Sequence, residues 1–132
     1  MSAEVSEVTS QLLRELRRGL LRLHKTLLDQ ETVVYEQAHG SVTRGGLLQL
    51  VINHEQFAWL HTISELIVRI DEMLSPKEPS LEADAKALLT QAQVLLTPAE
   101  TGSEFQRRYY AALQTEPEAV LAHRGVMQLF KN

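Results

Sequence analysis

The chain has 132 residues, 44% of them hydrophobic and 23% charged, with a formal net charge of −4 and no cysteine. This length suits a single domain over residues 1–132 with a sizeable core, and the composition excludes the disordered and fibrous classes. The lack of cysteine excludes a disulfide framework, a thiolate metal site and a cysteine nucleophile, and the negative charge argues against nucleic acid as a partner of the whole surface.

The first predicted helix spans residues 3–39. Its apolar residues recur at spacings of three and four, which is the helical period and not the strand period. They are Val5, Val8, Leu12, Leu16, Leu20, Leu23, Leu27 and Val34. Ser2 is a suitable N-cap and Gly40 a suitable C-terminal stop. Gly19 allows a bend, because glycine inside a helix costs about 1 kcal/mol relative to alanine.

The second predicted helix spans residues 44–74, with Thr43 as its N-cap and Ser75-Pro76 after its end. Its main apolar stripe is Leu48, Ile52, Trp59, Ile63, Leu66, Ile67, Ile70 and Leu74. A second apolar group, on roughly the opposite side at 100° per residue, is Leu50, Phe57 and Val68. A helix that is apolar on two sides is typical of the centre of a bundle or of a subunit interface.

Three shorter helices complete the predicted fold. The third, over residues 81–96, has one clean apolar stripe, and the fourth spans residues 104–114. A fifth begins at Thr115, because Thr115 and Glu118 fit a capping box. The fold class is therefore all-α: an elongated helical bundle with two long antiparallel helices, a third shorter helix and a C-terminal helical pair.

The lengths of the two long helices bear on assembly. At 1.5 Å per residue each would be about 45–55 Å long, whereas a compact chain of this size has a radius of gyration of about 14 Å. Two such helices leave apolar surface that the shorter ones cannot cover. We therefore expect a homodimer.

The chain begins with an acidic segment, residues 1–7, where a secretory peptide would be basic and then apolar. Its most hydrophobic stretch, residues 57–74, contains several ionisable side chains, whereas a bilayer span wants about 20 nearly uncharged residues. We expect a cytoplasmic protein with no membrane partner.

Polar residues on the two long helices form a candidate cluster. On the first helix Arg17, His24 and Glu31 are spaced seven apart, with Tyr35 beyond them, and on the second Asn53, Ser64 and Asp71 share a line beside His61. If these faces meet, the cluster is a structural network that fixes helix register or a pocket with shifted pKa values; otherwise these residues are the exposed edge of the bundle. In the pocket alternative the catalytic candidates are His24, Glu31, Tyr35, His61, Ser64 and Asp71. Arg17 and Asn53 would then bind the ligand.

Metal binding has little support in the sequence. Glu36 and His39 fit the Glu-x-x-His spacing of metal-binding bundles once, but a di-metal site needs a second copy, which the chain lacks. His54 and His61 lie about 10 Å apart along a helix, which is too far to share one ion. We expect no metal and no cofactor.

A basic ridge on the first helix offers another alternative. Arg14, Arg18, Arg22 and Lys25 lie along one side at intervals of three and four residues. Such a ridge is the solvated back of an amphipathic helix, a surface for an anionic partner, or a surface that associates with the acidic remainder of another copy.

One segment carries a resemblance. Phe57-Ala58-Trp59-Leu60, followed by residues 64–72, is similar to a segment of small uncharacterised bacterial all-helical proteins, over the first 74 residues and mostly within 57–72. The resemblance implies a helical fold and no particular activity. The DinB-like metal-binding bundles are a distant comparison, in which His54 would stand for their first ligand. The chain has no His-x-x-x-His pair, and its last part has His123 alone.

These observations favour a cytoplasmic helical bundle that acts by homo-oligomerisation and by binding a protein partner, without evident catalytic chemistry. The first alternative is a small-ligand or metal-dependent pocket between the two long helices. The second is anionic-partner binding through the basic ridge.

Overall fold

The computed structural model describes residues 4–75, 77 and 80–131. Every regular element in these ranges is a helix, so the prediction of an all-α fold is confirmed. The elements are α1 (Glu7–His39), α2 (Arg44–Asn53), the 3-10 helix η1 (Glu55–Leu60), α3 (His61–Leu74), α4 (Glu82–Leu95), α5 (Glu104–Thr115) and α6 (Pro117–Gln128).

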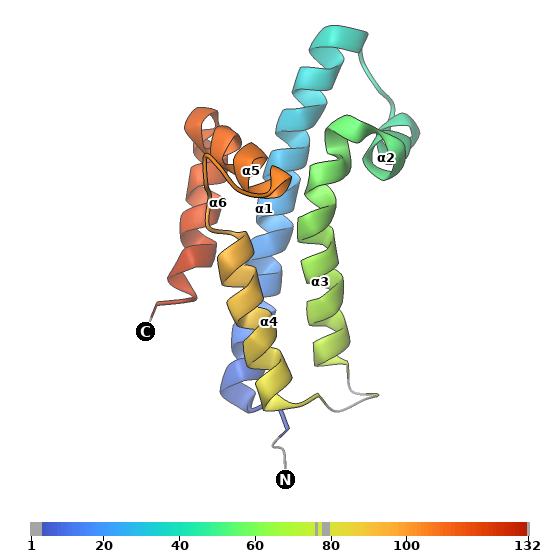
Figure 1. Cartoon of the computed structure of the whole chain (residues 1–132). Coiled ribbons are helices and arrows are strands. Elements are labelled where there is room, and N and C mark those ends of the chain that lie inside the picture. The colour runs from blue at the N-terminus through green and yellow to red at the C-terminus, as the bar shows by residue number, and fades with distance from the viewer. Residues whose placement is uncertain (1–3, 76, 78–79, 132) are drawn as a thin grey trace.

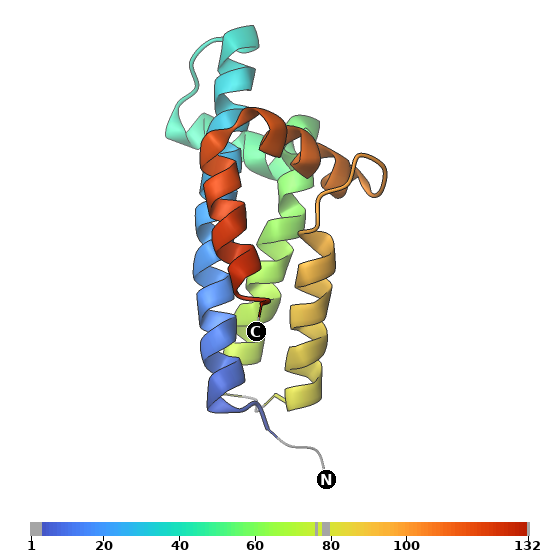
Figure 2. The same ribbon diagram turned by 90° about the vertical axis from the view of Figure 1, so that its left-hand side faces the viewer.

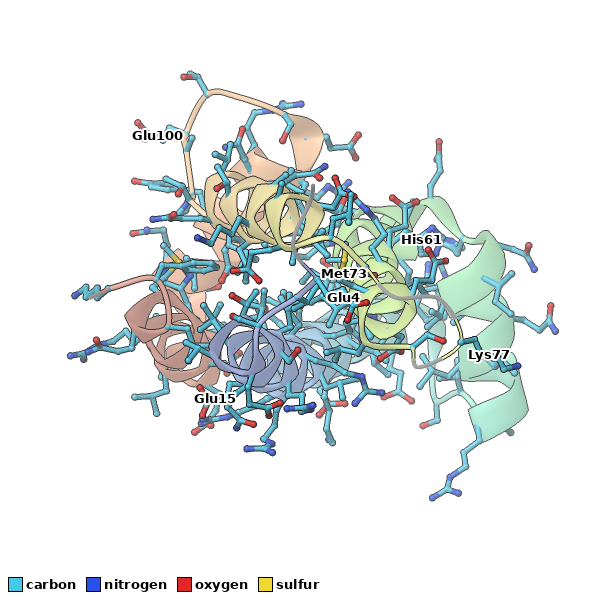
Figure 3. The ribbon with its side chains drawn as sticks, turned by 90° about the horizontal axis from the view of Figure 1, so that it is seen from below. Glu4, Glu15, His61, Met73, Lys77 and Glu100 are labelled. Atoms are coloured by element: carbon cyan, nitrogen blue, oxygen red, sulfur yellow. The ribbon has the colours of Figure 1, made fainter. Side chains whose placement is uncertain are left out.

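Four of these helices run side by side along one long axis. Figures 1 and 2 show α1, α3, α4 and α6 in this bundle, with the chain direction alternating from each to the next in sequence. Helix α5 crosses near the upper end, before α6 turns back down the bundle. Helix α2 lies outside the four, beside α3, in the view from below (Figure 3). The long α1 packs against both α3 and α6 and is the central element of the fold.

The core follows the helical period of α1. Leu13, Leu16, Leu20, Leu23 and Leu27 are completely buried. The predicted stripe is thus confirmed at its last four buried positions, whereas Leu13 is buried in place of the expected Leu12, and Val8 and Val34 are exposed. At the lower end the buried line of α1 runs through Thr9 and Leu13, so Val8 lies on another side of the helix.

Gly19 permits a close approach between α1 and α6. A Cβ atom at this position would lie only 2.7 Å from Cγ2 of Val126. Ala119 and Ala122, also buried on α6, are small as well, so the two helices pack at short range. The role of Gly19 is therefore this contact with α6, within one continuous helix.

The prediction of one unbroken helix over residues 44–74 is wrong, because the chain is extended at His54 (φ −89°, ψ 135°). The ring Nδ1 of His54 accepts a hydrogen bond of 3.0 Å from the backbone N–H of Gln56. This side-chain cap ends α2 and starts η1. The apolar pattern continues across the break and so conceals it.

Several helix ends agree with the sequence, and the start of α1 does not. Thr43 caps α2 by accepting from the N–H of Gly46, and α1 stops at Gly40, where φ is 88°. The N-cap of α1 is Ser6, which accepts from the N–H of Thr9, whereas the expected Ser2 lies outside the described residues. Helix α3 ends at Leu74 as expected, with Pro76 likewise outside them.

The predicted capping box at Thr115 is wrong. Thr115 is the last residue of α5, and its hydroxyl accepts a hydrogen bond from the amide of Gln30. Helix α6 begins at Pro117, because proline suits the first turn of a helix. No side chain caps the N-terminus of α6. The capping box of this region is instead Ser103 with Gln106, at the start of α5.

Candidate functional site

Two polar contacts join α1 to α3. Nε of Arg17 donates to Oδ1 of Asp71 at 2.5 Å, and the hydroxyl of Ser64 shares a hydrogen bond of 3.2 Å with Nε2 of His24. Burial lowers the pKa of His24 from its ordinary value, and the positive charge of nearby His61 lowers it further. These predicted site residues therefore lie together, in two separate pairs about two helical turns apart.

Glu31 ties η1 to α1. Its Oε1 accepts from Nε1 of Trp59 at 3.1 Å, and its Oε2 accepts from the amide of Gln56 at 2.8 Å. The same amide donates to the backbone carbonyl of Glu31. Both carboxylate oxygens are thus occupied by structural contacts.

Two of the remaining predicted residues, Tyr35 and His61, hold α2 in place. The Tyr35 ring lies against His54 with the ring centroids 5.5 Å apart, and Nε2 of His61 donates to the carbonyl of Val51 at 2.8 Å. Asn53 makes only a local contact, in which its amide donates to Oε1 of Gln49. These contacts attach α2 to the upper end of the α1–α3 pair.

The structure distributes the candidate residues along the bundle and does not gather them at one point. Arg17, which is paired with Asp71, lies about 21 Å along the helix axis from Glu31 at 1.5 Å per residue. Catalytic groups must converge on one reacting atom, and the carboxylates of Asp71 and Glu31 do not. Within the described ranges no group of three or more His, Asp or Glu side chains is placed to hold a metal ion.

An open cavity of about 450 Å³ lies between α1, η1 and α5. Glu31 lines it, as the sequence suggested, but Trp59, Arg108 and Thr115 were not expected there. These residues line the cavity because α5 packs against η1, and no pattern in the sequence predicts that contact.

Two further polar contacts have no counterpart in the sequence analysis. The hydroxyl of Tyr109 lies 2.6 Å from Nδ1 of His123, and burial raises the pKa of Tyr109 and lowers that of His123. At the base of the bundle Oε2 of Glu82 accepts from the Thr9 hydroxyl at 2.6 Å, and its Oε1 accepts from the N–H of Ser6. The hydrogen bond from Thr9, followed by that from Ser6, lowers the pKa of Glu82.

The outer surface carries apolar side chains that the monomer leaves uncovered. No residue of α2 is buried, and Leu48 and Ile52 are 57% and 55% exposed. Leu21 of α1 and Val68 of α3 are 43% and 53% exposed.

The basic ridge of α1 is also at the surface. Arg14, Arg18, Arg22 and Lys25 are all exposed. Arg14 forms an exposed ion pair with Glu7 at 3.5 Å, and Lys25 one with Asp29 at 2.8 Å.

Comparisons with protein-family models, with curated proteins and with solved structures find no match for this chain. Along the described chain, no helix combines the length and the apolar character that a membrane span requires.

Proposed function

We propose that this protein is a cytoplasmic helical binding protein that works by associating with a second copy of itself and presenting the assembled surface to a protein partner. The observation that carries the proposal is the exposure of apolar side chains on α2. Helix α2 has no fully buried residue: Leu47, Leu50 and Val51 pack partly against the core, while Leu48 and Ile52 remain exposed. An apolar surface of this kind is typical of an interaction site.

The break at His54 changes the basis of this proposal. An unbroken helix over residues 44–74 would have needed a partner along its whole length to cover its second apolar side. Phe57 and Trp59 are in fact buried within one chain. Exposed apolar side chains occur on several helices, and four of them lie on α2 and on the α1–α3 pair beside it: Leu48, Ile52, Leu21 and Val68. These residues, and no longer the length of the helices, support association.

The pocket alternative has less support. Both carboxylate oxygens of Glu31 already accept hydrogen bonds from Trp59 and Gln56, so the main polar group of the cavity has structural partners. A ligand would have to replace these bonds at a cost of about 1–3 kcal/mol for each group left unpaired.

The mass of the protein in solution tests the proposal. We expect sedimentation and light scattering to report a concentration-dependent dimer, with a dissociation constant in the range of about 1–100 μM. The variant Leu48→Glu with Ile52→Glu should weaken it, since it places charges in the contact. Val94→Glu on α4, at a residue that is 59% exposed, is the matched control and should leave the mass unchanged. A wild-type monomer at several hundred micromolar would overturn the proposal.

A further inference from the structure

We propose that the outer α1–α3 face is the surface on which the second copy docks, with a two-fold axis parallel to the bundle. In this arrangement the basic row of each α1, Arg18 and Arg22, meets the acidic row of the other copy's α3, Glu65 and Glu72. The inference rests on the proposed self-association and specifies its surface and its orientation.

The centre of this face is apolar. Leu21 lies four residues after Arg17 and three before His24, the two α1 residues that contact α3. Val68 has the corresponding place on α3, four residues after Ser64 and three before Asp71. Residues at these spacings share one side of a helix, so both exposed apolar side chains border the α1–α3 groove.

The two rows of charge flank this centre. Arg18 and Arg22 on α1 and Glu65 and Glu72 on α3 are all exposed. Among the described residues none of the four has an oppositely charged group within ion-pair distance. The chain therefore presents a positive row and a negative row side by side. Between them lie the apolar pair Leu21 and Val68 and the half-exposed ion pair of Arg17 with Asp71. An apolar centre with a charged rim is the usual anatomy of a protein interface.

The order of the rows selects one symmetry. If the two-fold axis runs parallel to the helices, α1 of one copy faces α3 of the other, and each positive row meets a negative one. If the axis runs across the helices, α1 faces α1 and the arginine rows repel each other. Charge complementarity thus favours the parallel axis.

The positions of the charges along the helices also match. Arg17 lies opposite Asp71 and His24 opposite Ser64, so residues at the same height have numbers that add to 88. A two-fold axis parallel to the helices keeps each residue at its own height. Arg22 then lies within about 2 Å, along the axis, of Glu65 of the second copy, and Arg18 within about 3 Å of Glu72. Arginine and glutamate side chains easily span such offsets.

The size of the face indicates a weak to moderate complex. The 14 residues of α3 give a length of about 21 Å, and two helices about 10 Å wide give about 400 Å². A standard interface uses about 800 Å² per partner. Helix α2 stands at the upper end of this face, held by His61 and Tyr35, and its exposed Leu48 and Ile52 supply additional apolar area.

Charge reversal followed by mixing tests the orientation. One variant carries Arg18→Glu and Arg22→Glu, and another carries Glu65→Lys and Glu72→Lys. Each variant alone should raise the dimer dissociation constant at least tenfold, because every contact between the rows becomes repulsive. An equimolar mixture of the two should form a heterodimer, because both contacts are again between opposite charges. Arg107→Glu with Arg124→Glu, two exposed arginines on α5 and α6, is the control and should dimerise like the wild type.

The outcomes separate this inference from the proposed function. A wild-type monomer would remove both. A dimer that resists both charge reversals would overturn the inference and leave self-association standing. Pairing of the arginine variant with the wild type, and not with the lysine variant, would show α1 against α1 and would also overturn it. Loss of heparin binding without any change in dimer mass would instead assign the arginine row to an anionic partner.

Discussion

The hydroxyl of Tyr109 on α5 lies 2.6 Å from Nδ1 of His123 on α6, and the two rings meet edge to face. Burial favours the neutral form of both groups, so the tyrosine donates and the histidine accepts. This bond joins the last two helices through their polar atoms in an otherwise apolar layer. Protonation of His123 would remove the acceptor.

We expect the protein to lose stability on mild acidification. Burial lowers the pKa of His24 and of His123 below the ordinary value of 6.5, so the unfolded chain binds more protons than the folded one just below that pH. The free energy of unfolding should therefore fall as the pH drops from about 7.5 to about 5.5. Urea unfolding at the two pH values measures it. The variant His24→Gln with His123→Gln should show a smaller fall, and His39→Gln, at an exposed site, the same fall as the wild type. An equal fall in all three proteins would contradict the assignment.

Substitution of Gly19 should separate helix propensity from packing. Gly19→Ala places a methyl group 2.7 Å from Cγ2 of Val126, and overpacking of a core costs about 1–3 kcal/mol, more than the gain of about 1 kcal/mol in propensity. Adding Val126→Ala should recover part of the loss, giving a measurable coupling in a double-mutant cycle. Gly125→Ala, which meets nothing within 4 Å, should instead stabilise the protein. Equal gains at both glycines would disprove the close approach.

The Glu31 contacts should be visible in the fluorescence of the single tryptophan. Glu31→Ala leaves Nε1 of Trp59 without its acceptor, and we expect a loss of about 2 kcal/mol in stability with a shift of emission to longer wavelength. Glu31→Gln keeps an acceptor and should cost less than half as much. Identical emission from the wild type and the alanine variant would exclude this contact.

The cap at His54 should hold the break between α2 and η1. His54→Ala removes the acceptor for the N–H of Gln56 and should cost about 1 kcal/mol, whereas His54→Asn keeps a capping acceptor and should cost little. Chemical unfolding measures both variants. Faster proteolysis between α2 and η1 in the alanine variant alone would support the cap, and equal losses in the two variants would refute it.

The helical class and the buried side of α1 are readable from the sequence, because burial of Leu16, Leu20, Leu23 and Leu27 follows directly from the period. The break at His54 is not readable. The apolar spacing runs through it undisturbed, and a single side-chain hydrogen bond decides the backbone there.

The candidate site was predicted in part. The sequence placed Arg17, His24 and Glu31 on one line of a helix, and all three do make polar contacts across to the following helices. Asp71 and Ser64, the partners of Arg17 and His24, were among the predicted residues. The partners of Glu31, Gln56 and Trp59, were not expected, because η1 brings them to α1 only after the break. The pair of Tyr109 and His123 depends on how α5 crosses α6, which no local pattern encodes.

The hydrogen bonds from Ser6 and Thr9 to Glu82 have a consequence for synthesis of the chain. The start of α1 leaves the ribosome before Glu82 does, and the carboxylate that receives its N-terminal hydrogen bonds follows more than 70 residues later. The lower end of the fold therefore stays open until Glu82 has emerged. A nascent chain stalled before residue 82 would expose that end to chaperones and proteases.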